Sequence, residues 1–188
     1  MIIFGVDPGT MCTGFGIVKH DNNELTNIRS GIIVPPSDVD IPHKLEFIYN
    51  ELNKLMRKYK PDEFSIETAF YGKNIQSALK IGYVRGISLL AAVHNGLPTG
   101  EYSPREIKKS VVGNGAASKD QVQFMIKKLL YLKNDNMKFD ESDALAVAIC
   151  HCFKVNSAAY KNGNKAVKTK KGSGWKAYLD ANPGKVIE

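Results

Sequence analysis

The stretch Met1–Val18, MIIFGVDPGTMCTGFGIV, decides the fold. Its run Ile2–Val6 is too short for a helix, rich in β-branched and aromatic residues, and apolar on both faces, which predicts a central strand. Asp7 falls at the end of this strand, and Pro8-Gly9 predicts a turn because proline fixes φ and glycine accepts φ > 0. A second strand begins at Gly14. The stretch therefore predicts a β-hairpin with a carboxylate at its turn, although an aspartate before Pro-Gly is also typical of a simple turn former.

The length and the cysteine content exclude several classes of protein. At 188 residues the chain can form one domain with a real core. Three cysteines are an odd number, so no disulfide framework is predicted, and Cys150-His151-Cys152 fits metal ligation poorly because neighbours at i and i+2 point to different helix faces. No segment reaches the roughly eighteen apolar residues of a membrane span, and Met1 leads directly into a strand. We expect a soluble, untargeted, cytoplasmic protein.

Positive charge gathers towards the C-terminus. The net charge is +7, and residues from Lys154 onward hold eight lysines and only two acids, which leaves residues 1–153 nearly neutral. The terminal stretch is rich in Asn, Gly, Ser and Lys and is too polar to support a packed core. The sequence therefore predicts a folded domain over 1–156 and a basic, flexible tail over 157–188.

Hydrophobic periodicity predicts the other elements. Alternating or apolar runs indicate strands over 24–34, 63–68 and 97–102. Apolar residues at three-and-four spacing indicate helices over 41–59, 75–95, 104–112 and 119–132, and a last helix from about Asp140. In helix 75–95, Ala78, Gly82 and Gly86 form a ridge of small residues that favours close packing, either across a dimer or against the protein's own sheet. This succession of elements predicts an α/β fold.

Four acids lie at the ends of predicted elements. Glu67 falls at the end of strand 63–68, and Asp140 and Asp143 lead a helix that continues with apolar residues, although the helix dipole alone also favours acids there. With Asp7 they cannot lie close together unless a cation neutralises them, because like charges raise one another's pKa. Oxygen ligands without His or Cys favour Mg²⁺ or Mn²⁺, and two such ions about 3.5–4 Å apart can drive phosphodiester hydrolysis. The acids therefore predict a metal-dependent phosphodiester hydrolase.

The sequence resembles a known family in four blocks that occur in the family's order and spacing. The blocks are GVDPGTMCTGFGIV, FSIETAFYGKNIQSALKIGYVRG, KKSVVGNGAASKDQVQFM and DESDALAVAICH. Over residues 1–153 they closely resemble the RuvC family of bacterial Holliday junction resolvases. The resemblance implies a ribonuclease H-like fold with a five-stranded mixed β-sheet flanked by α-helices. It also implies a homodimer that nicks four-way DNA symmetrically in recombination and repair, with the RuvA–RuvB branch-migration complex as partner.

The same resemblance assigns roles to individual residues. By matching the family's motifs, Asp7, Glu67, Asp140 and Asp143 correspond to its four catalytic, metal-binding acids. Phe70 matches an aromatic that stacks on an unpaired base near the crossover, although a buried loop anchor is the alternative. Lys108 and Lys119 match lysines that contact backbone phosphate. For Lys73, Arg85 and Lys109, which lack such a match, we favour ordinary solvated side chains.

Two other classes of protein share part of this pattern. The motif Asp7-Pro8-Gly9-Thr10 is also similar to the phosphate loop of actin-like sugar kinases and chaperone ATPases. Those proteins need two such domains and a second Asp-Gly loop, which this sequence does not offer. A non-catalytic junction-binding module is the other alternative. It is disfavoured because four acids beside DNA phosphate would weaken binding without a catalytic purpose.

Overall fold

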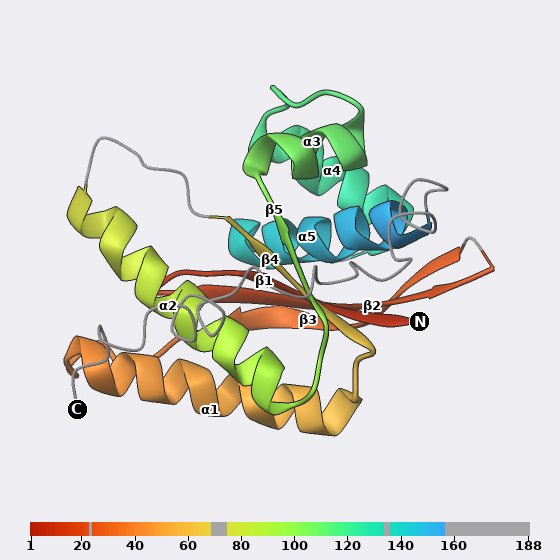
Figure 1. Cartoon of the computed structure of the whole chain (residues 1–188). Helices are drawn as coiled ribbons and strands as arrows, with labels where there is room; N and C mark the ends of the chain where they lie inside the picture. Colours follow the sequence, from red (N-terminus) through yellow and green to blue (C-terminus); the bar gives the residue numbers. More distant parts are fainter. Residues whose placement is uncertain (23, 69–74, 134–135, 157–188) are drawn as a thin grey trace, which may run out of the picture. The chain divides into compact units, whose positions relative to one another are not determined.

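The computed structural model describes residues 1–22, 24–68, 75–133 and 136–156 (Figure 1). Its elements are, in chain order, β1 (Ile2–Asp7), β2 (Thr13–Asp21), β3 (Glu24–Ile33), α1 (Ile41–Tyr59), β4 (Glu63–Glu67), α2 (Ile75–His94), β5 (Thr99–Tyr102), α3 (Pro104–Val112), α4 (Lys119–Leu129) and α5 (Phe139–Asn156). The tail predicted over 157–188 lies outside the described residues.

The five strands form one mixed sheet in the order β3-β2-β1-β4-β5. Strands β1, β2 and β3 pair antiparallel as a meander. Strand β4 pairs with β1 in parallel, and β5 pairs with β4 in parallel. Strand β1 is therefore central and has helices on both faces, which explains its continuous apolar run. The predicted hairpin and the predicted five-stranded mixed sheet are both confirmed, and the fold is ribonuclease H-like.

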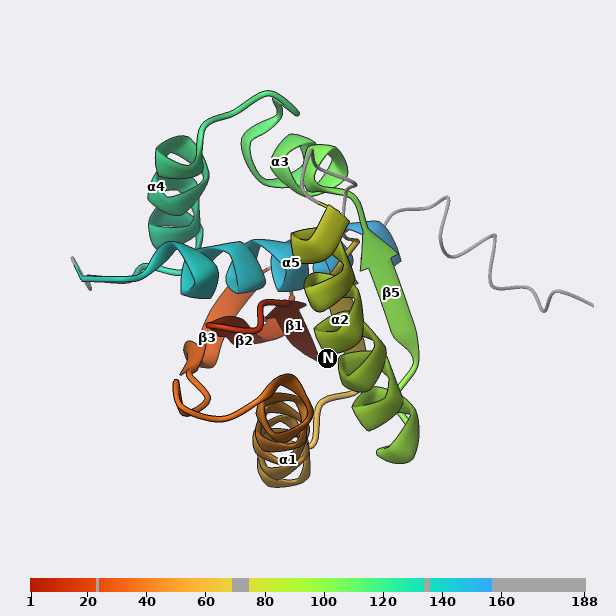
Figure 2. The same cartoon turned by 90° about the vertical axis from the view of Figure 1, so that its left-hand side faces the viewer.

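The two faces of the sheet carry separate cores. Helices α1 and α2 cover one face, and α5 covers the other with α3 and α4 packed outside it (Figures 1 and 2). The first core contains Phe4, Val6, Phe15, Ile17, Phe64 and Ile66 from the sheet with Ile48, Leu52, Met56 and Val84 from the helices. The second contains Ile3 and Val18 from the sheet with Ile107, Val122, Ile126 and the run Leu145–Cys150.

Helix α5 lies unusually close to the sheet because the strands beneath it present glycine. A Cβ added at Gly5 would meet the Ala144 carbonyl oxygen at 2.4 Å, and one added at Gly14 would meet the Asp140 carbonyl oxygen at 1.9 Å. Residues Ala144–Cys150 are buried, as predicted for a helix that is apolar nearly all round. The close approach fixes the position of the acidic first turn of α5 relative to β1.

The structure corrects the end of one predicted helix. Helix α4 ends at Leu129, three residues before the predicted Leu132. Tyr131 adopts a left-handed φ of 52°, and the Leu132 amide donates to the Lys127 carbonyl at 2.9 Å, the pattern of a Schellman cap. Apolar periodicity continued past this point because Leu130 and Leu132 still pack on the core, although the backbone has left the helix.

Other features predicted from sequence can be followed in the described residues. No helix there is long and apolar enough to cross a membrane. None of the three cysteines, which all lie in the described residues, forms a disulfide, and His151 contacts Glu63 and Tyr102 through hydrogen bonds of 2.8 Å. Beyond helix α2's own backbone, a Cβ added at Gly82 or Gly86 would meet no atom within 4 Å. Among the described residues, Gly82 and Gly86 of the ridge therefore do not pack against the protein's own sheet.

The substitution Gly5→Ala should destabilise the protein, because the added methyl group overlaps the backbone of α5 at Ala144 and Ala148. We expect a loss of about 1–3 kcal/mol in the free energy of unfolding, measured by urea denaturation. Asn50→Ala is the control: it introduces alanine at an exposed position of helix α1, where alanine is favoured. Equal stability of Gly5→Ala and the wild type would contradict the close packing of α5 on β1.

Candidate active site

Asp7 and Glu67 lie at the ends of neighbouring parallel strands. Val6 of β1 is opposite Ile66 of β4, so Asp7 and Glu67 occupy the next position on each strand. Side chains alternate along a strand, and Gly5 faces α5, so Asp7 faces α5 as well. The sheet therefore directs both carboxylates to the side covered by α5.

Helix α5 brings the other two acids to these strand ends. Asp140 and Asp143 are three residues apart, and Gly14, where the Asp140 carbonyl packs, is the pairing partner of Asp7. The thiol of Cys12, in the turn between β1 and β2, hydrogen-bonds to the Asp140 side chain. Burial, before the nearby charge of Asp140, raises the pKa of this thiol to about 11. Sequence reasoning missed this contact, because a lone cysteine gives no signal of its partner.

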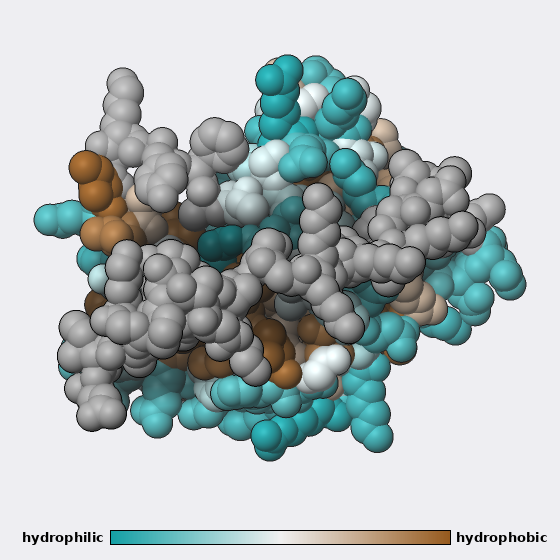
Figure 3. All heavy atoms as spheres, in the orientation of Figure 1, coloured by the Kyte–Doolittle hydropathy of each residue, from teal (hydrophilic) through white to brown (hydrophobic). Residues whose placement is uncertain are grey.

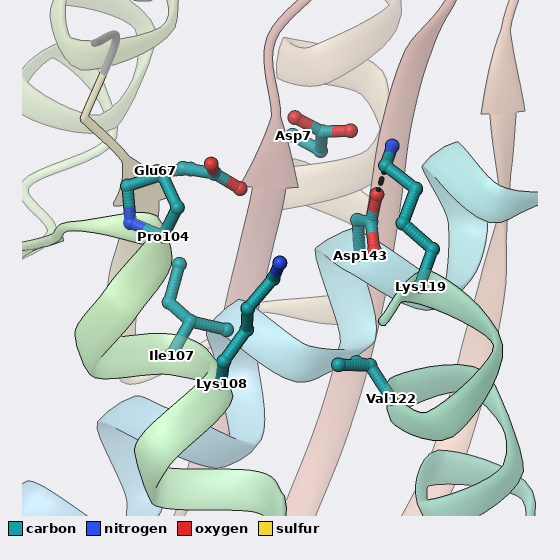
Figure 4. Close-up of a pocket in the computed structure, with 8 residues that line it drawn as sticks. All are labelled: Asp7, Glu67, Pro104, Ile107, Lys108, Lys119, Val122 and Asp143. Carbon is teal, nitrogen blue, oxygen red and sulfur yellow. Dashed lines mark hydrogen bonds and ion pairs between the residues drawn. The ribbon is translucent and has the colours of Figure 1, made fainter. Parts of the chain in front are cut away.

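Three of the four acids line one pocket with a volume of about 180 Å³ (Figure 4). Its lining residues are Asp7, Glu67, Asp143, Lys108, Lys119, Pro104, Ile107 and Val122. The last three form an apolar wall from α3 and α4, which sequence reasoning did not assign to the site. Asp140 does not line the pocket, but its charge acts on Asp7. The structure thus gathers three of the four predicted acids and the two predicted lysines in one pocket, with Asp140 near enough to act on Asp7.

The acids repel one another strongly enough to shift their protonation. Burial and then the charges of Glu67, Asp143 and Asp140 raise the pKa of Asp7 to about 8. Burial and then the charge of Asp143 raise the pKa of Glu67 to about 7. Carboxylates with pKa values this far above normal mark a site that lacks positive charge.

Two lysines supply part of that positive charge. Lys119 Nζ lies 2.9 Å from Asp143 Oδ2, and this hydrogen bond raises the pKa of Lys119. The Lys108 side chain enters the same pocket from α3 (Figure 4), and its charge lowers the pKa of Glu67. Both lysines therefore lie beside the acids, and their contact with backbone phosphate stays a prediction.

The donor set suits a hard divalent cation. The acids provide only oxygen ligands, which Mg²⁺ and Mn²⁺ prefer, and a cation would relieve the repulsion that raises the two pKa values. In the described part of the chain, no three acid, His or Cys side chains yet converge as a finished ligand set. Asp143 is not free to act as a ligand, because the Lys119 ammonium donates a hydrogen bond to its Oδ2 atom (Figure 4).

Other predicted site residues lie elsewhere. Phe70 and Lys73 fall outside the described residues, so the stacking role of Phe70 stays a prediction. Arg85 forms an ion pair with Glu101, and Lys109 lies exposed on α3 outside the pocket. Neither contacts the acids.

Fold and site together define a ribonuclease H-like domain with an acidic centre at the ends of its central strands. The family model for the Crossover junction endodeoxyribonuclease RuvC matches residues 3–151. The crossover junction endodeoxyribonuclease RuvC of Chloroherpeton thalassium is 44% identical over 188 residues, which are 100% of both chains. The chain therefore belongs to the RuvC family.

Solved structures agree with this assignment. A structure of Thermus thermophilus RuvC matches with a TM-score of 0.74 and 25% identity, over 82% of this chain and 95% of that one. The same Thermus protein in complex with a Holliday junction substrate matches with a TM-score of 0.75 and 23% identity, over the same shares. These matches confirm the ribonuclease H-like fold.

The substitution Asp7→Asn should stabilise the metal-free protein at alkaline pH. Asp7 has a pKa of about 8 in the folded protein and 3.8 as its ordinary value. Between these values the folded state binds a proton that the unfolded chain releases, so wild-type stability falls as pH rises from about 4 to about 8. Asparagine avoids this penalty, which is of the order of a few kcal/mol.

The measurement is the free energy of unfolding in EDTA at pH 4 and pH 8.5. We expect Asp7→Asn and the wild type to differ little at pH 4 and the variant to be more stable at pH 8.5. Excess Mg²⁺ should narrow the difference by stabilising the wild type. Asp38→Asn, at an exposed position, is the matched control. A variant less stable than the wild type at pH 8.5 would show that Asp7 is not repelled by its neighbours.

Proposed function

We propose that this protein is a crossover junction endodeoxyribonuclease that resolves Holliday junctions by paired, symmetric nicking of phosphodiester bonds. The observation that carries the proposal is the pocket in which Asp7, Glu67 and Asp143 meet Lys108 and Lys119 on the fold of the RuvC family. Hydrolysis of a nucleic-acid backbone uses carboxylates to bind metal ions and positive groups to bind the phosphate, and this pocket offers both.

The proposed cofactor is Mg²⁺, two ions per subunit, with Mn²⁺ able to substitute. Asp7, Glu67, Asp140 and Asp143 would hold the ions, which activate water and stabilise the leaving oxygen when bound. The chain's own groups prepare the site for this. The sheet and α5 hold their carboxylates close together, and the repulsion that raises the pKa values of Asp7 and Glu67 favours the binding of a cation.

The two lysines act on the substrate in this proposal. Lys108 and Lys119 enter the pocket from α3 and α4, on the side away from the strand ends that carry Asp7 and Glu67 (Figure 4). A phosphate bound in the pocket would have its developing negative charge met by the ammonium group of Lys108 and, once Lys119 exchanges Asp143 for the phosphate, by that of Lys119. The apolar side chains of Ile107 and Val122 limit the water that reaches it.

The proposed active unit is a two-fold dimer that associates through one face of α2. Residues spaced three and four apart on this helix are exposed (part of this face is seen in Figure 3): Ile75, Leu79, Gly82, Tyr83, Gly86, Leu90 and Val93. We call this set the α2 outer face. Ile75 and Val93 are 73% and 63% exposed. The occupant is a second copy of this chain, since a four-way junction needs two symmetric nicks and each chain holds one site.

The proposal has further parts that rest on family resemblance alone. They are a stacking role for Phe70 and a partnership with the RuvA–RuvB branch-migration complex. A cytoplasmic location is also proposed, from the cysteine content of the sequence. The basic tail over 157–188 remains a predicted appendage to the nuclease domain over 1–156, and its lysines are suited to contacts with phosphate that salt screens.

A synthetic four-way junction tests the proposed activity. The wild type should nick opposing strands with Mg²⁺ and not with EDTA, as seen on a denaturing gel. Asp7→Asn should abolish nicking while junction binding persists, because an amide cannot hold the metal but removes a charge that repels DNA. Asp38→Asn should cut normally. A protein that binds junctions but never nicks them would instead be the non-catalytic module.

Gly86→Leu tests the dimer. A bulky side chain at position 86, which has open space around it, should leave the protomer folded but hold the α2 helices of the two protomers apart. We expect sedimentation to shift towards monomer and paired nicking to fall before single-strand nicking does. Asn50→Leu adds the same side chain to an exposed position of α1 and serves as the control. A Gly86→Leu protein that remains dimeric would place the interface elsewhere.

A further inference from the structure

The ion pair between Lys119 and Asp143 joins a pocket acid to an exposed cation. Lys119 Nζ donates a hydrogen bond to Asp143 Oδ2 at 2.9 Å (Figure 4). The Lys119 side chain is 60% exposed, whereas that of Asp143 is 16% exposed. The acid is therefore sheltered in the pocket while its partner is open to solvent. A group that enters the pocket from solvent reaches Lys119 before it reaches Asp143.

Lys119 and a metal ion compete for the same acid. An ammonium beside a carboxylate neutralises its charge and repels a second cation at that place. Asp140, the other proposed metal ligand on α5, has a different partner, because its side chain bonds to the neutral thiol of Cys12. A neutral donor leaves the charge of a carboxylate in place, whereas Lys119 cancels that of Asp143. Asp143 is therefore the acid whose availability to a metal ion depends on a cationic side chain.

Lys119 can leave Asp143 without a change in the backbone. It is the first residue of α4, where a capping box fixes the main chain: Ser118 Oγ accepts the Gln121 amide at 3.2 Å, and Gln121 Oε1 accepts the Ser118 amide at 2.9 Å. The lysine side chain has a flexible four-carbon stem. Its ammonium also lies 5.9 Å from the centre of the Phe139 ring, a contact that does not depend on Asp143. Rotation of the side chain alone can therefore carry the ammonium from Asp143 to a neighbouring anion.

Lys108 carries the same charge into the pocket without such a pair. It lines the pocket from α3, and among the described residues no acid forms an ion pair with its ammonium (Figure 4). Its charge acts on Glu67 through space. The two lysines thus offer equal charge to a phosphate, but only Lys119 gives up an acid when it binds one.

We propose that Lys119 couples the binding of DNA to the binding of metal ions at the active site. In the free protein Lys119 engages Asp143; a DNA phosphate at the pocket takes over the ammonium, and Asp143 is released to act as a metal ligand. This inference rests on the proposed nuclease function and concerns the regulation of the same site. The coupling is reciprocal, because each ligand raises the affinity for the other by the same factor. The set of metal ligands is thus completed where a phosphate is bound.

Two binding measurements that need no cleavage test this coupling. Calorimetry gives the dissociation constant of Ca²⁺, a probe cation that binds oxygen ligands, for the DNA-free protein. Fluorescence anisotropy gives the dissociation constant of a labelled four-way junction in EDTA and in saturating Ca²⁺, at constant ionic strength. The ratio of the two junction constants is the coupling factor. A denaturing gel confirms that the junction is uncut during the measurement.

The variants differ in which lysine loses its charge. Lys119→Met removes the ammonium that pairs with Asp143. Lys108→Met is the matched control, because it removes the same charge from the same pocket and breaks no ion pair with a described residue.

We expect Lys119→Met to bind Ca²⁺ about tenfold more tightly than the wild type in the absence of DNA, because Asp143 is then available throughout. With DNA bound, Asp143 is available in both proteins, so the coupling factor of the variant should fall by the same amount. Lys108→Met should bind the junction more weakly with and without Ca²⁺. Its coupling factor should equal that of the wild type, because Lys108 gives up no acid.

The outcomes separate this inference from the function on which it rests. The role of Lys119 is overturned, with the nuclease function left standing, if the wild type nicks junctions in Mg²⁺ but Lys119→Met and Lys108→Met gain Ca²⁺ affinity equally. Equal gains would show only a general effect of charge. A Lys119→Met protein that keeps the wild-type coupling factor overturns the role in the same way. A wild type that shows the coupling but nicks no junction in Mg²⁺ overturns the nuclease function instead, and one that binds neither Ca²⁺ nor the junction overturns both.

Discussion

The close contact between α5 and the glycines of β1 and β2 is the constraint on which the site depends. With side chains at Gly5, Gly14 or Gly16, helix α5 would be pushed away from the sheet. The carboxylates of Asp140 and Asp143 would then recede from Asp7. The bare strip of backbone on the central strands is therefore as much a part of the active site as the acids.

The position of α5 along the sheet is fixed at its other end. His151 hydrogen-bonds to Glu63 at the start of β4, while Asp143 acts on Glu67 at the end of that strand. The eight residues from Asp143 to His151 rise about 12 Å along the helix, and the four from Glu63 to Glu67 rise about 13 Å along the strand. The two positions on α5 therefore match the two ends of β4. The hydrogen bond of His151 to Tyr102 joins β5 to the same arrangement. A buried polar network thus holds the register in which the acids meet.

How much of this could be predicted depends on the range of the interactions involved. The strand of Ile2–Val6, the helix over 41–59 and the acids at element ends follow from local periodicity, and the structure agrees with them. Two contacts join distant parts of the chain: the ion pair of Lys119 with Asp143 and the hydrogen bond of Cys12 with Asp140. No pattern in the neighbouring sequence predicts either contact. Motif resemblance could place Lys119 near the site, but it could not show that its ammonium occupies an acid oxygen.

The same limit applies to the ridge of Ala78, Gly82 and Gly86. Its spacing predicted a close contact but not the partner, because helical periodicity marks a face without saying what lies opposite. The structure shows the two glycines open, with Val84 and Ser88 of α2 turned to the core instead. The helix that carries this open face begins only eight residues after Glu67. In a dimer through the α2 outer face, the helix at the interface would follow closely in sequence after the strand that carries Glu67. The interface would therefore set the distance between the two active sites. Such a link is what an enzyme needs to cut two symmetric strands at a fixed separation.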